Sequence, residues 1–454
     1  MKTTQDAILE KTLEEKWKNI RSILLNANRY QKIRDMAKEM RPNEVAALIQ
    51  YLDPPLRKKL IKVLKSDMDP DVFVFLDQSV RESIVSMISA HQITSILKVL
   101  ESDDALSLVS SMKEGQKEKV LNSLPVTARK KIIQGLAYPE SSAGRLMQTE
   151  ILSLPLSWTV KKSLEHIIIS DVPDMVSDAF IVDEQNRPVG TVSLLNLIKT
   201  DKSLYLKDVM DTDIQTIPDC LDEEEAAFTF RMNDLMIAPV VDADQKLVGM
   251  ITADDVIDVV NKKATEDLLH MGGVHEDDFY QSATRASISR ARWLLITLIN
   301  TFLTSIVIGR FQDTLANQIA LTVFMPVAAA MGGNAGIQST TIVTRALATK
   351  ELGKMNMRRF LFKECRIALL SSVYFGIISF LIGFLYFHDI VIAFVLGSSV
   401  IFNILWAGIF GTVLPVVIQH FGHDPALSAS PLLTTTTDVF GYAVFLGLAR
   451  LLMS

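Results

Sequence analysis

The sequence predicts a multidomain membrane protein with three consecutive parts: an N-terminal all-α superhelical repeat, a duplicated α+β unit and a C-terminal bundle of five transmembrane helices. Three observations predict this order. Apolar residues recur every 12 positions in the first third, one block recurs after 59 positions in the middle, and long runs without charge fill the last third. At 454 residues, the chain is also too long for a single domain.

Charge is divided unevenly along the chain. Residues 285–454 contain 12 bases and 6 acids, a net charge of +6, whereas the rest contains 34 bases and 46 acids, a net charge of −12. An acidic soluble region therefore precedes an apolar, mildly basic one. Two cysteines, Cys220 and Cys365, are too few for a disulfide framework or a thiolate metal site. The charged first twenty residues lack the apolar core of a signal peptide, so we expect the soluble part in the cytoplasm.

The first part, residues 1–137, is predicted to be a helical repeat. Two apolar residues four positions apart recur every 12 residues, with turn-forming residues between the pairs. Prolines within this part exclude one long helix, and each short helix needs neighbours to bury its apolar stripe. We therefore expect stacked short helices that form an interaction or sensing surface. The repeat positions are Leu48, Leu60, Val72, Ile84, Ile96, Leu108, Val120 and Ile132 and, four residues on, Leu52, Leu64, Leu76, Ile88, Leu100, Met112, Leu124 and Leu136.

The second part, residues 138–262, contains one unit twice. Residues 181–183 and 190–193 are matched at a spacing of 59 by residues 240–242 and 249–252. Each copy is predicted to contain a helix, two short strands joined by a turn, and another helix. This pattern resembles a tandem CBS pair, a fold that regulates other domains far more often than it catalyses.

One CBS copy retains the residue pair that contacts ribose in that family, a hydroxyl residue with an acid three positions on. The pair is Thr252 and Asp255, and the resemblance implies a nucleotide site there for ATP. In the first copy Ser193 is followed by Asn196 where the acid would stand.

Five apolar runs predict transmembrane helices in the third part, residues 289–454. Each is long enough to cross a hydrocarbon core about 30 Å thick, and five such runs argue against buried helices of a soluble protein. A connecting helix and linker, residues 263–288, precede them. The predicted spans are about 293–309, 315–344, 367–387, 390–419 and 431–449.

Basic residues predict the orientation of these spans. Three arginines precede the first span, and seven bases crowd the loop between the second and third spans. Alternation then places the N-terminus and the soluble domains in the cytoplasm and the C-terminus outside. We expect a multi-pass protein of the cell inner membrane.

A single aspartate, Asp438, interrupts the last apolar run after the threonines 434–437. A carboxylate inside a membrane is costly unless it faces a cavity, a partner or an ion. A protonated carboxyl group bonded to a neighbouring helix is the structural alternative. No Lys or Arg lies inside the predicted spans to pair with Asp438, so a cation is the simplest missing partner.

The second apolar run is rich in glycine and in neutral oxygen donors. Gly332, Gly333 and Gly336 permit either close helix packing or a local break that exposes backbone carbonyls. Neutral oxygens with one carboxylate suit a hard cation that keeps its waters, as Mg²⁺ tends to do. Thiolates and clustered histidines, which zinc or copper would favour, are absent from the spans. The neutral donors are Asn334, Gln338, Ser339, Thr340 and Thr341.

The whole chain resembles the MgtE family of magnesium channels and transporters. The resemblance covers all three parts and includes residues 138–144, which lead into the CBS pair. Its most specific motifs are Gly332-Gly333-Asn334 with Gln338-Ser339, and Asp424-Pro425-Ala426 followed by Asp438.

This resemblance implies a homodimer in the lipid bilayer with a pore at its axis that imports Mg²⁺. Asp438 of each subunit would bind the hydrated ion, with Asn334 and the backbone at Gly332 and Gly336 nearby. The cytoplasmic domains would sense Mg²⁺, and the connecting helix would close the pore. Nucleic acid is not an expected partner.

Acidic residues of the soluble part are candidates for the sensor. Packed carboxylates repel one another, and a divalent ion between them relieves the repulsion; ions favour the closed state only if they bind it better than the open one. A solvated acidic face is the alternative for any single acid. The candidates are Asp103, Asp104, Asp222, Glu224, Asp234, Asp255, Asp258, Glu266 and Asp267.

The connecting helix departs from the family pattern at Lys262 and Lys263, where acids are common. These cations remove ligands and repel Mg²⁺ locally. Lys263 is instead a candidate for a built-in salt bridge to a facing acid, which would shift Mg²⁺ gating.

Other functions remain as alternatives. A broader carrier of Co²⁺ or Mn²⁺ would use the same residues. An intramembrane enzyme with a CBS regulator needs a second catalytic group, and only Asp438 is available in the predicted spans. An anion channel would favour a cationic or amide lining of its pore. ATP-driven transport would need a phosphate-binding loop, and the sequence contains none.

Overall fold

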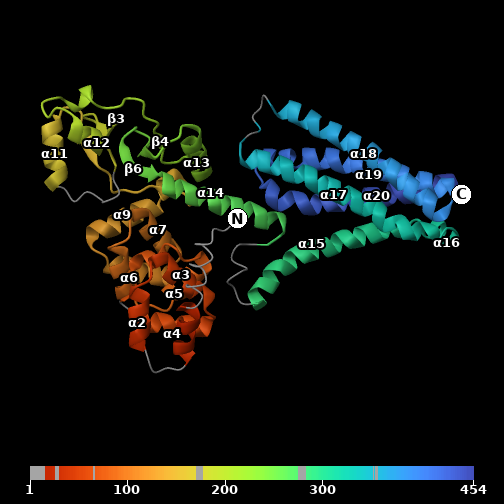
Figure 1. The fold of residues 1–454 in the computed structure, drawn as a ribbon, viewed down its shortest axis with the longest axis horizontal. Helices are drawn as coiled ribbons and strands as arrows, with labels where there is room; N and C mark the ends of the chain where they lie inside the picture. Colours follow the sequence, from red (N-terminus) through yellow and green to blue (C-terminus); the bar gives the residue numbers. More distant parts are fainter. Residues whose placement is uncertain are drawn as a thin grey trace. The chain divides into compact units, whose positions relative to one another are not determined.

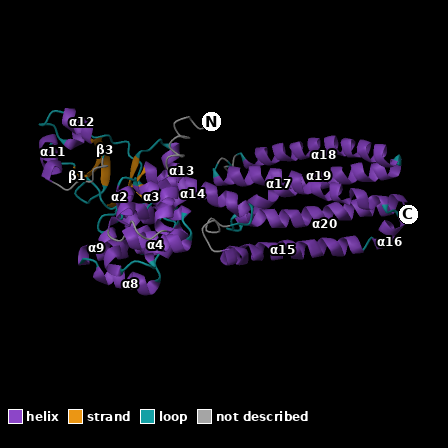
Figure 2. Cartoon of the chain, turned by 60° about the horizontal axis from the view of Figure 1, so that its bottom comes forward, coloured by secondary structure: helices purple, strands orange, loops and turns teal. Residues whose placement is uncertain are grey.

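The structure, a computed structural model, divides into two compact units, Met1–Lys263 and Ala264–Ser454, which are considered separately. Helices dominate both units, and the strands of the described part lie between Ser153 and Thr252 (Figures 1 and 2). The described residues are 16–25, 30–64, 67–169, 177–274, 283–350, 352 and 356–453.

The N-terminal part of the first unit consists of short helices, which begin where local sequence signals favour them. Pro42 and Pro54 stand at the first positions of α3 and α4, where a proline loses no helical hydrogen bond. Asp77 and Ser89 cap the N-termini of α5 and α6. After a helical stretch at 16–25, the elements are α2 (Tyr30–Lys38), α3 (Pro42–Tyr51), α4 (Pro54–Leu64), η2 (Pro70–Phe73), α5 (Gln78–Val85), α6 (Ala90–Leu97), α7 (Ser102–Ser110), α8 (Glu114–Ser123) and α9 (Val126–Leu136).

The 12-residue repeat supplies the core of this helical stack. Of the sixteen repeat positions, twelve are buried and four, Ile88, Ile96, Leu100 and Leu136, are half-buried. Helix α6 packs on α8, and α7 packs on α9. The prediction of an all-α N-terminal domain of stacked short helices is confirmed.

The duplicated unit forms two three-stranded sheets of the same topology. In each sheet the first strand is parallel and the third antiparallel to the middle strand. The middle and last strands of the two copies are offset by 59 residues, as the sequence predicts. The strands are β1 (Ser153–Pro155), β2 (Asp178–Val182), β3 (Pro188–Ser193), β4 (Ile217–Pro218), β5 (Ile237–Val241) and β6 (Leu247–Thr252); the helices are α10 (Ala143–Leu146), α11 (Val160–Ile169), α12 (Leu194–Lys199), η3 (Leu206–Asp208), α13 (Glu223–Met232) and α14 (Ala253–Met271).

The two copies pack together through β2 of the first sheet and β6 of the second. Phe180 and Val182 of the first copy form one apolar cluster with Leu247 and Met250 of the second. The backbone N–H of Leu247 donates to the carbonyl of Asn186 at 2.8 Å. The predicted tandem CBS pair is therefore one packed body.

The second unit contains five helices long and apolar enough to cross a membrane. Helix α19 is their centre: it packs against α17, α18 and α20, while α15 packs mainly along α20 (Figure 2). A buried core of α17, α19 and α20 includes Leu321, Val400 and Phe445. The helices are α15 (Ala283–Gly309), α16 (Gln312–Asn317), α17 (Ala320–Ala348), α18 (Met357–Phe387), α19 (Ile390–His420) and α20 (Pro425–Met453).

These helices extend beyond the charge-free runs that predict them. Helix α18 begins ten residues before position 367, and α20 begins six residues before position 431. The run from 315 is divided, because the short α16 ends at Asn317 before α17 begins. A charge-free run marks only the part of a helix inside hydrocarbon, whereas the helix itself continues into the polar zone.

Candidate functional site

Asp438 lies in the interior of α20, where it is half-buried. Among the residues that the structure describes, its carboxylate forms no hydrogen bond and no ion pair. It therefore lacks, within one subunit, the partner that a carboxylate inside a membrane requires.

The threonines before Asp438 are bonded within their own helix. The hydroxyl of Thr435 donates to the carbonyl of Pro431 at 2.6 Å, and that of Thr437 donates to the carbonyl of Thr434 at 3.1 Å. Each hydroxyl thus uses its proton on the helix backbone and keeps oxygen lone pairs for another ligand. Thr437 is fully buried, whereas Thr434, Thr435 and Thr436 are half-buried.

The glycines of α17 allow close helix packing rather than a break. Helix α17 is continuous from Ala320 to Ala348. A Cβ at Gly332 would collide with the amide of Asn403 on α19. A Cβ at Gly411 of α19 would lie 2.7 Å from the carbonyl oxygen of Gly336. Of the two roles that the sequence allows for these glycines, the structure shows close packing, at Gly332 and Gly336.

Asn403 is a buried polar residue at this crossing that sequence reasoning missed. Its Nδ2 donates to the carbonyl of Ala328 at 2.7 Å, while its Oδ1 is buried with no hydrogen-bond partner among the described residues. Gly441 of α20 also approaches Asn403 closely. Three helices therefore meet around one amide.

Asn334 lines a cavity of about 240 Å³ between α17, α18 and α19. Gln338 and Ser339 share this cavity, and Glu364 of α18 contributes a carboxylate that is only 3% exposed. Asp438 is not part of the lining. Within one subunit, Asn334 and Asp438 thus belong to different surroundings.

Sequence reasoning also missed Glu364, because it stands three residues before the run that begins at Ile367. Glu364, Ala368 and Ser371 lie on one face of α18, at helical spacing. Extending this spacing to residues before Ile367 would have identified Glu364. The membrane unit therefore contains a second buried carboxylate besides Asp438.

Three carboxylates meet at the beginning of α7 in the soluble unit. Glu101 is the N-cap residue, and Asp103 and Asp104 lie in the first turn. One oxygen from each lies within 4.8 Å of the others. We call Glu101, Asp103, Asp104 and Asp255 the acidic cluster.

Gln148 connects the two halves of the acidic cluster. Its Nε2 donates to Oε2 of Glu101 at 2.9 Å and to Oδ2 of Asp255 at 3.3 Å. Asp255 lies on α14, so the cluster brings the helical repeat domain against the second CBS copy. Glu101 was not among the predicted sensor residues; its place in the turn before Asp103 and Asp104 is the signal that could have found it.

The acidic cluster is electrostatically unfavourable while no cation is bound. Burial, followed by the neighbouring carboxylates, raises the pKa of Asp103 from 3.8 to about 8 and that of Asp104 to about 6. Burial and neighbouring acids likewise raise the pKa of Glu101 and of Asp255. Oδ1 of Asp103 is buried with no hydrogen-bond partner among the described residues. Such a donor set fits a divalent cation, which would satisfy the orphaned oxygen and remove the repulsion.

The other predicted sensor acids have separate surroundings. Asp222 caps α13, and Asp234 is exposed with a positive φ of 50°. Asp258 is exposed on α14, near enough to contribute to the raised pKa of Asp255. Oε1 of Glu224 lies 3.2 Å from Nζ of Lys263. The predicted salt bridge of Lys263 is therefore present, with Glu224 as the facing acid.

The end of α14 contacts the loop before α20 in the membrane unit. Nδ1 of His270 lies 3.2 Å from Oδ2 of Asp424, and Oδ1 of Asp424 accepts the backbone N–H of Ala426 at 2.8 Å. Glu266 lies 3.9 Å from the other ring nitrogen of His270. Asp267 is half-buried on the same helix.

The two residues of the predicted nucleotide site are bonded to each other. Oγ1 of Thr252 donates to Oδ2 of Asp255 at 2.6 Å. Asp255 is also a member of the acidic cluster, so a ribose and a cation would use the same carboxylate. In the first copy, Ser193 accepts the backbone N–H of Asn196 and serves as the N-cap of α12.

These observations define a class of protein: a multi-pass membrane protein whose soluble region carries a helical repeat domain and a CBS pair. Comparison with protein families agrees over all three parts. Residues 325–448 match the divalent cation transporter model of MgtE, residues 40–141 match the MgtE intracellular N domain, and residues 206–262 match the CBS domain.

Two curated relatives match most of the chain. It is 32% identical to the magnesium transporter MgtE of Thermus thermophilus over 77% of this chain and 78% of the relative. It is 26% identical to the magnesium transporter MgtE of Bacillus subtilis over 94% of this chain and 95% of the relative. The chain belongs to the MgtE family of magnesium transporters, and thus to a class of transporters rather than enzymes.

Solved structures resemble the soluble part. The soluble part of a magnesium transporter aligns at 26% identity with a TM-score of 0.48, covering 56% of this chain and 99% of that structure. The cytosolic domain of the Mg²⁺ channel MgtE in complex with ATP aligns at 23% identity with a TM-score of 0.49, covering 54% and 99%.

Proposed function

We propose that the protein imports Mg²⁺ across the cell inner membrane through a pore that contains Asp438. The observation that carries this proposal is the half-buried carboxylate of Asp438 inside a transmembrane helix with no partner among the described residues. A hydrated divalent cation supplies the missing charge without demanding a closed cage of protein ligands, because Mg²⁺ keeps several of its waters. The magnesium transporters among its relatives support the choice of ion.

The pore is proposed to form between two copies of the chain. A second Asp438 across a dimer axis would double the negative charge at the ion. Asn334 and the backbone at Gly332 and Gly336 belong to α17, which packs against α20 and so stands beside the Asp438 helix. Helix α15 is consistent with this assembly, because only 6% of its most apolar window is buried within one subunit. Lipid and the second subunit would cover the rest.

Mg²⁺ bound in the soluble region is proposed to close the pore. An ion at the acidic cluster would join α7 to α14, and α14 continues toward the membrane part as the connecting helix. The ion favours this closed arrangement because it binds four gathered carboxylates better than separated ones. Asp222, Glu224, Asp234, Asp258, Glu266 and Asp267 would contribute further acidic charge along α13 and α14.

The orientation follows from the basic residues that flank the spans. The soluble domains are proposed to lie in the cytoplasm and the C-terminus outside. The acidic cluster would then sample the Mg²⁺ concentration of the compartment into which the pore delivers the ion.

ATP is proposed as a second ligand of the CBS pair, at Thr252 and Asp255. A ribose hydroxyl would have to replace the bond between these two residues. Because Asp255 also belongs to the acidic cluster, ATP and Mg²⁺ at this carboxylate should compete unless the phosphates bring their own ion. Titration calorimetry with ATP on the full chain and on Thr252→Val tests this; equal heats for both would remove the site.

Transport itself is tested with the full chain in liposomes that contain a fluorescent Mg²⁺ indicator. The indicator should report Mg²⁺ entry that protein-free liposomes lack, and the entry should slow when Mg²⁺ is present on the side of the soluble domains. Replacing Mg²⁺ by Co²⁺ or Mn²⁺, with matched indicators, separates a selective carrier from a broad one. Uptake no faster than in protein-free liposomes would contradict the proposed function.

A further inference from the structure

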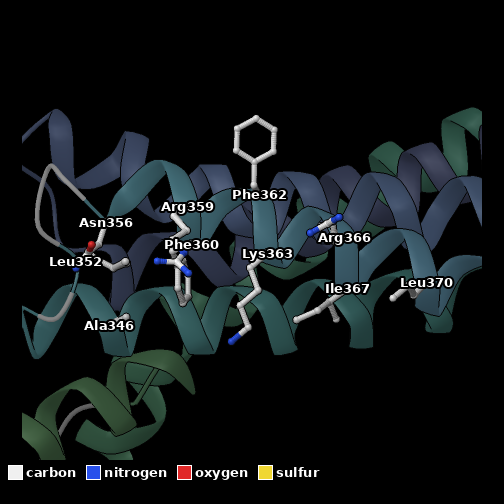
Figure 3. A pocket seen from close by; sticks show the side chains of 10 residues that line it. All are labelled: Ala346, Leu352, Asn356, Arg359, Phe360, Phe362, Lys363, Arg366, Ile367 and Leu370. Carbon is white, nitrogen blue, oxygen red and sulfur yellow. The ribbon is translucent and has the colours of Figure 1, made fainter.

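A basic pocket of about 850 Å³ opens between the end of α17 and the beginning of α18. Three cations line it, Arg359, Lys363 and Arg366, at a spacing of four and then three residues along one face of α18. In Figure 3 these side chains follow one another along the helix, and Ile367 and Leu370 come further along. Apolar side chains therefore line the pocket on both sides of the cations, with Ala346, Leu352 and Phe360 near Arg359.

The length of α18 places these three cations at the edge of the bilayer. Its 31 residues span about 46 Å at about 1.5 Å per residue, whereas a hydrocarbon core of about 30 Å needs only about 20 residues. The charge-free stretch that ends at Phe387 fills the core. The cations at 359, 363 and 366 then lie at the level of lipid headgroups, and Leu370 lies at the boundary of the acyl chains.

The three cations have no acidic partner in the described part of the chain. All three are exposed, and none forms an ion pair there. The acid next to Lys363 in sequence, Glu364, is buried and lines the separate cavity of Asn334. Three positive charges on one exposed face repel one another unless an anion lies between them.

The apolar lining beyond Arg366 decides between anions. A soluble anion, such as inorganic phosphate, would use the cations and leave Ile367 and Leu370 without a role; these side chains are 45% and 72% exposed. A phospholipid offers a phosphate to the cations and acyl chains to the apolar residues at the matching depth. Basic pockets between transmembrane helices on the cytoplasmic side suit such headgroups.

We propose that Arg359, Lys363 and Arg366 form a binding site for the headgroup of an anionic phospholipid. Guanidinium groups hold phosphate through paired N–H donors, and the lysine contributes a mobile point charge. Ile367 and Leu370 lie against the first methylenes of its acyl chains. The site would therefore prefer lipids with net negative charge to zwitterionic ones.

Native mass spectrometry of the full chain in detergent, after removal of bound lipid, tests this proposal. Phosphatidylglycerol and phosphatidylcholine are titrated separately. The test variant combines Arg359→Gln, Lys363→Gln and Arg366→Gln. The control variant combines Arg285→Gln, Arg290→Gln and Arg292→Gln on α15, which removes the same charge elsewhere.

The wild type should bind phosphatidylglycerol more tightly than phosphatidylcholine. The pocket variant should lose at least about tenfold in affinity for phosphatidylglycerol, because each base near an anionic headgroup adds to the binding free energy. The affinity of the α15 control variant should change by about twofold or less. Inorganic phosphate in millimolar excess should leave the bound lipid in place. Lys363→Gln alone, expected to weaken binding about threefold, keeps the test available if the triple variant does not fold.

Three results would overturn the proposal. Unchanged affinity in a folded pocket variant would show that these bases do not hold the headgroup. An equal loss in both triple variants would indicate diffuse charge instead of a site. Displacement of the lipid by inorganic phosphate, with no preference for anionic lipid, would assign the pocket to a soluble anion.

Discussion

Asp103 shows at the scale of one residue why a bound cation would stabilise the soluble region. Its carboxyl group is buried beside Asp104 and near Asp255, and its Oδ1 has no hydrogen-bond partner in the described part. Because its pKa is raised to about 8, this group carries a proton at neutral pH when no metal is bound. A bound divalent ion would displace that proton and take its place.

A pH dependence follows from the acidic cluster. The folded pKa values of Asp103 and Asp104 are raised above 3.8, to about 8 and about 6, so their stabilising contribution is present at low pH and is lost as pH rises through these values. In Mg²⁺-free buffer, the resistance of the soluble unit to proteolysis should therefore fall between about pH 4 and pH 8, from the ordinary pKa of 3.8 to the raised pKa of Asp103. Saturating Mg²⁺ should remove most of this fall.

Asp103→Asn provides the matching variant for this pH series. It removes the titrating group with the highest pKa, so protection should become less dependent on pH and on Mg²⁺. Glu114→Gln serves as control, because Glu114 is exposed on α8 and pairs only with Lys117 among the described residues. A wild type whose protection rises with pH in Mg²⁺-free buffer would contradict the assigned role of Asp103.

At the scale of helices, the membrane unit depends on the close approach of α17 to α19. Gly332→Ala would place a methyl group against Nδ2 of Asn403, which already donates to the carbonyl of Ala328. We expect this overpacking to cost about 1–3 kcal/mol and to lower the melting temperature of the detergent-solubilised protein.

The neighbouring glycine is a matched control for that substitution. Beyond the backbone of its own helix, no atom of the described residues lies within 4 Å of an added Cβ at Gly333. Gly333→Ala should therefore leave the melting temperature unchanged or raise it slightly, because alanine favours a helix by about 0.5–1 kcal/mol over glycine. Equal melting temperatures for the two variants would show that the α17–α19 contact is looser than described.

Helix α14 carries a cation where its relatives are expected to carry acids. The bridge between Lys263 and Glu224 is partly exposed, with side chains 33% and 45% accessible, so it is worth about 0.2–1 kcal/mol. Lys263→Glu should replace this attraction by repulsion. The Mg²⁺ concentration at which half of the protein is protected from cleavage in α14 should then rise by up to about fivefold.

Two further variants isolate this effect. Lys262→Glu changes the same charge at an exposed neighbour that forms no ion pair in the described part, and it should shift protection less. Combining Lys263→Glu with Glu224→Lys should restore the wild-type value. The same Mg²⁺ dependence in wild type and Lys263→Glu would remove Lys263 from the gate.

At the scale of the whole molecule, the regular patterns were predictable from the sequence. The 12-residue recurrence gave the buried positions of the N-terminal helices because stacking forces one face of each helix inward. The offset of 59 residues gave the duplicated sheets, and five charge-free runs gave the spans. Each of these patterns extends over many residues, so local exceptions do not hide it.

Singular contacts between distant segments were not predictable. Asp255 joins the carboxylates of α7 through Gln148, which bonds to Asp255 and, 47 residues away in sequence, to Glu101. Glu364 is buried because α18 continues beyond its charge-free run, which hydropathy alone does not reveal. In the sequence, Asn403 is a single polar residue in an apolar run. Its hydrogen-bond partner, the carbonyl of Ala328, comes close only where the three helices cross.

The membrane unit and the soluble unit thus carry different kinds of acidic site. Asp438 is a half-buried carboxylate in an apolar helix, suited to an ion in transit. The acidic cluster gathers four carboxylates around an orphaned oxygen, suited to an ion that stays. Transport and sensing would then depend on the same ion, which would stay bound for a shorter time at Asp438 than at the acidic cluster.

Mg²⁺ uptake by liposomes that carry Asp438→Asn tests the central claim most directly. The substitution keeps the size of the side chain and removes its charge, and hydrogen bonds to a charged group are worth about 1.5–3 kcal/mol, so uptake should fall at least about tenfold. Asp389→Asn is the control, since asparagine retains the N-cap that Asp389 provides for α19, and it should transport at the wild-type rate. Wild-type uptake by Asp438→Asn would contradict the proposed pore.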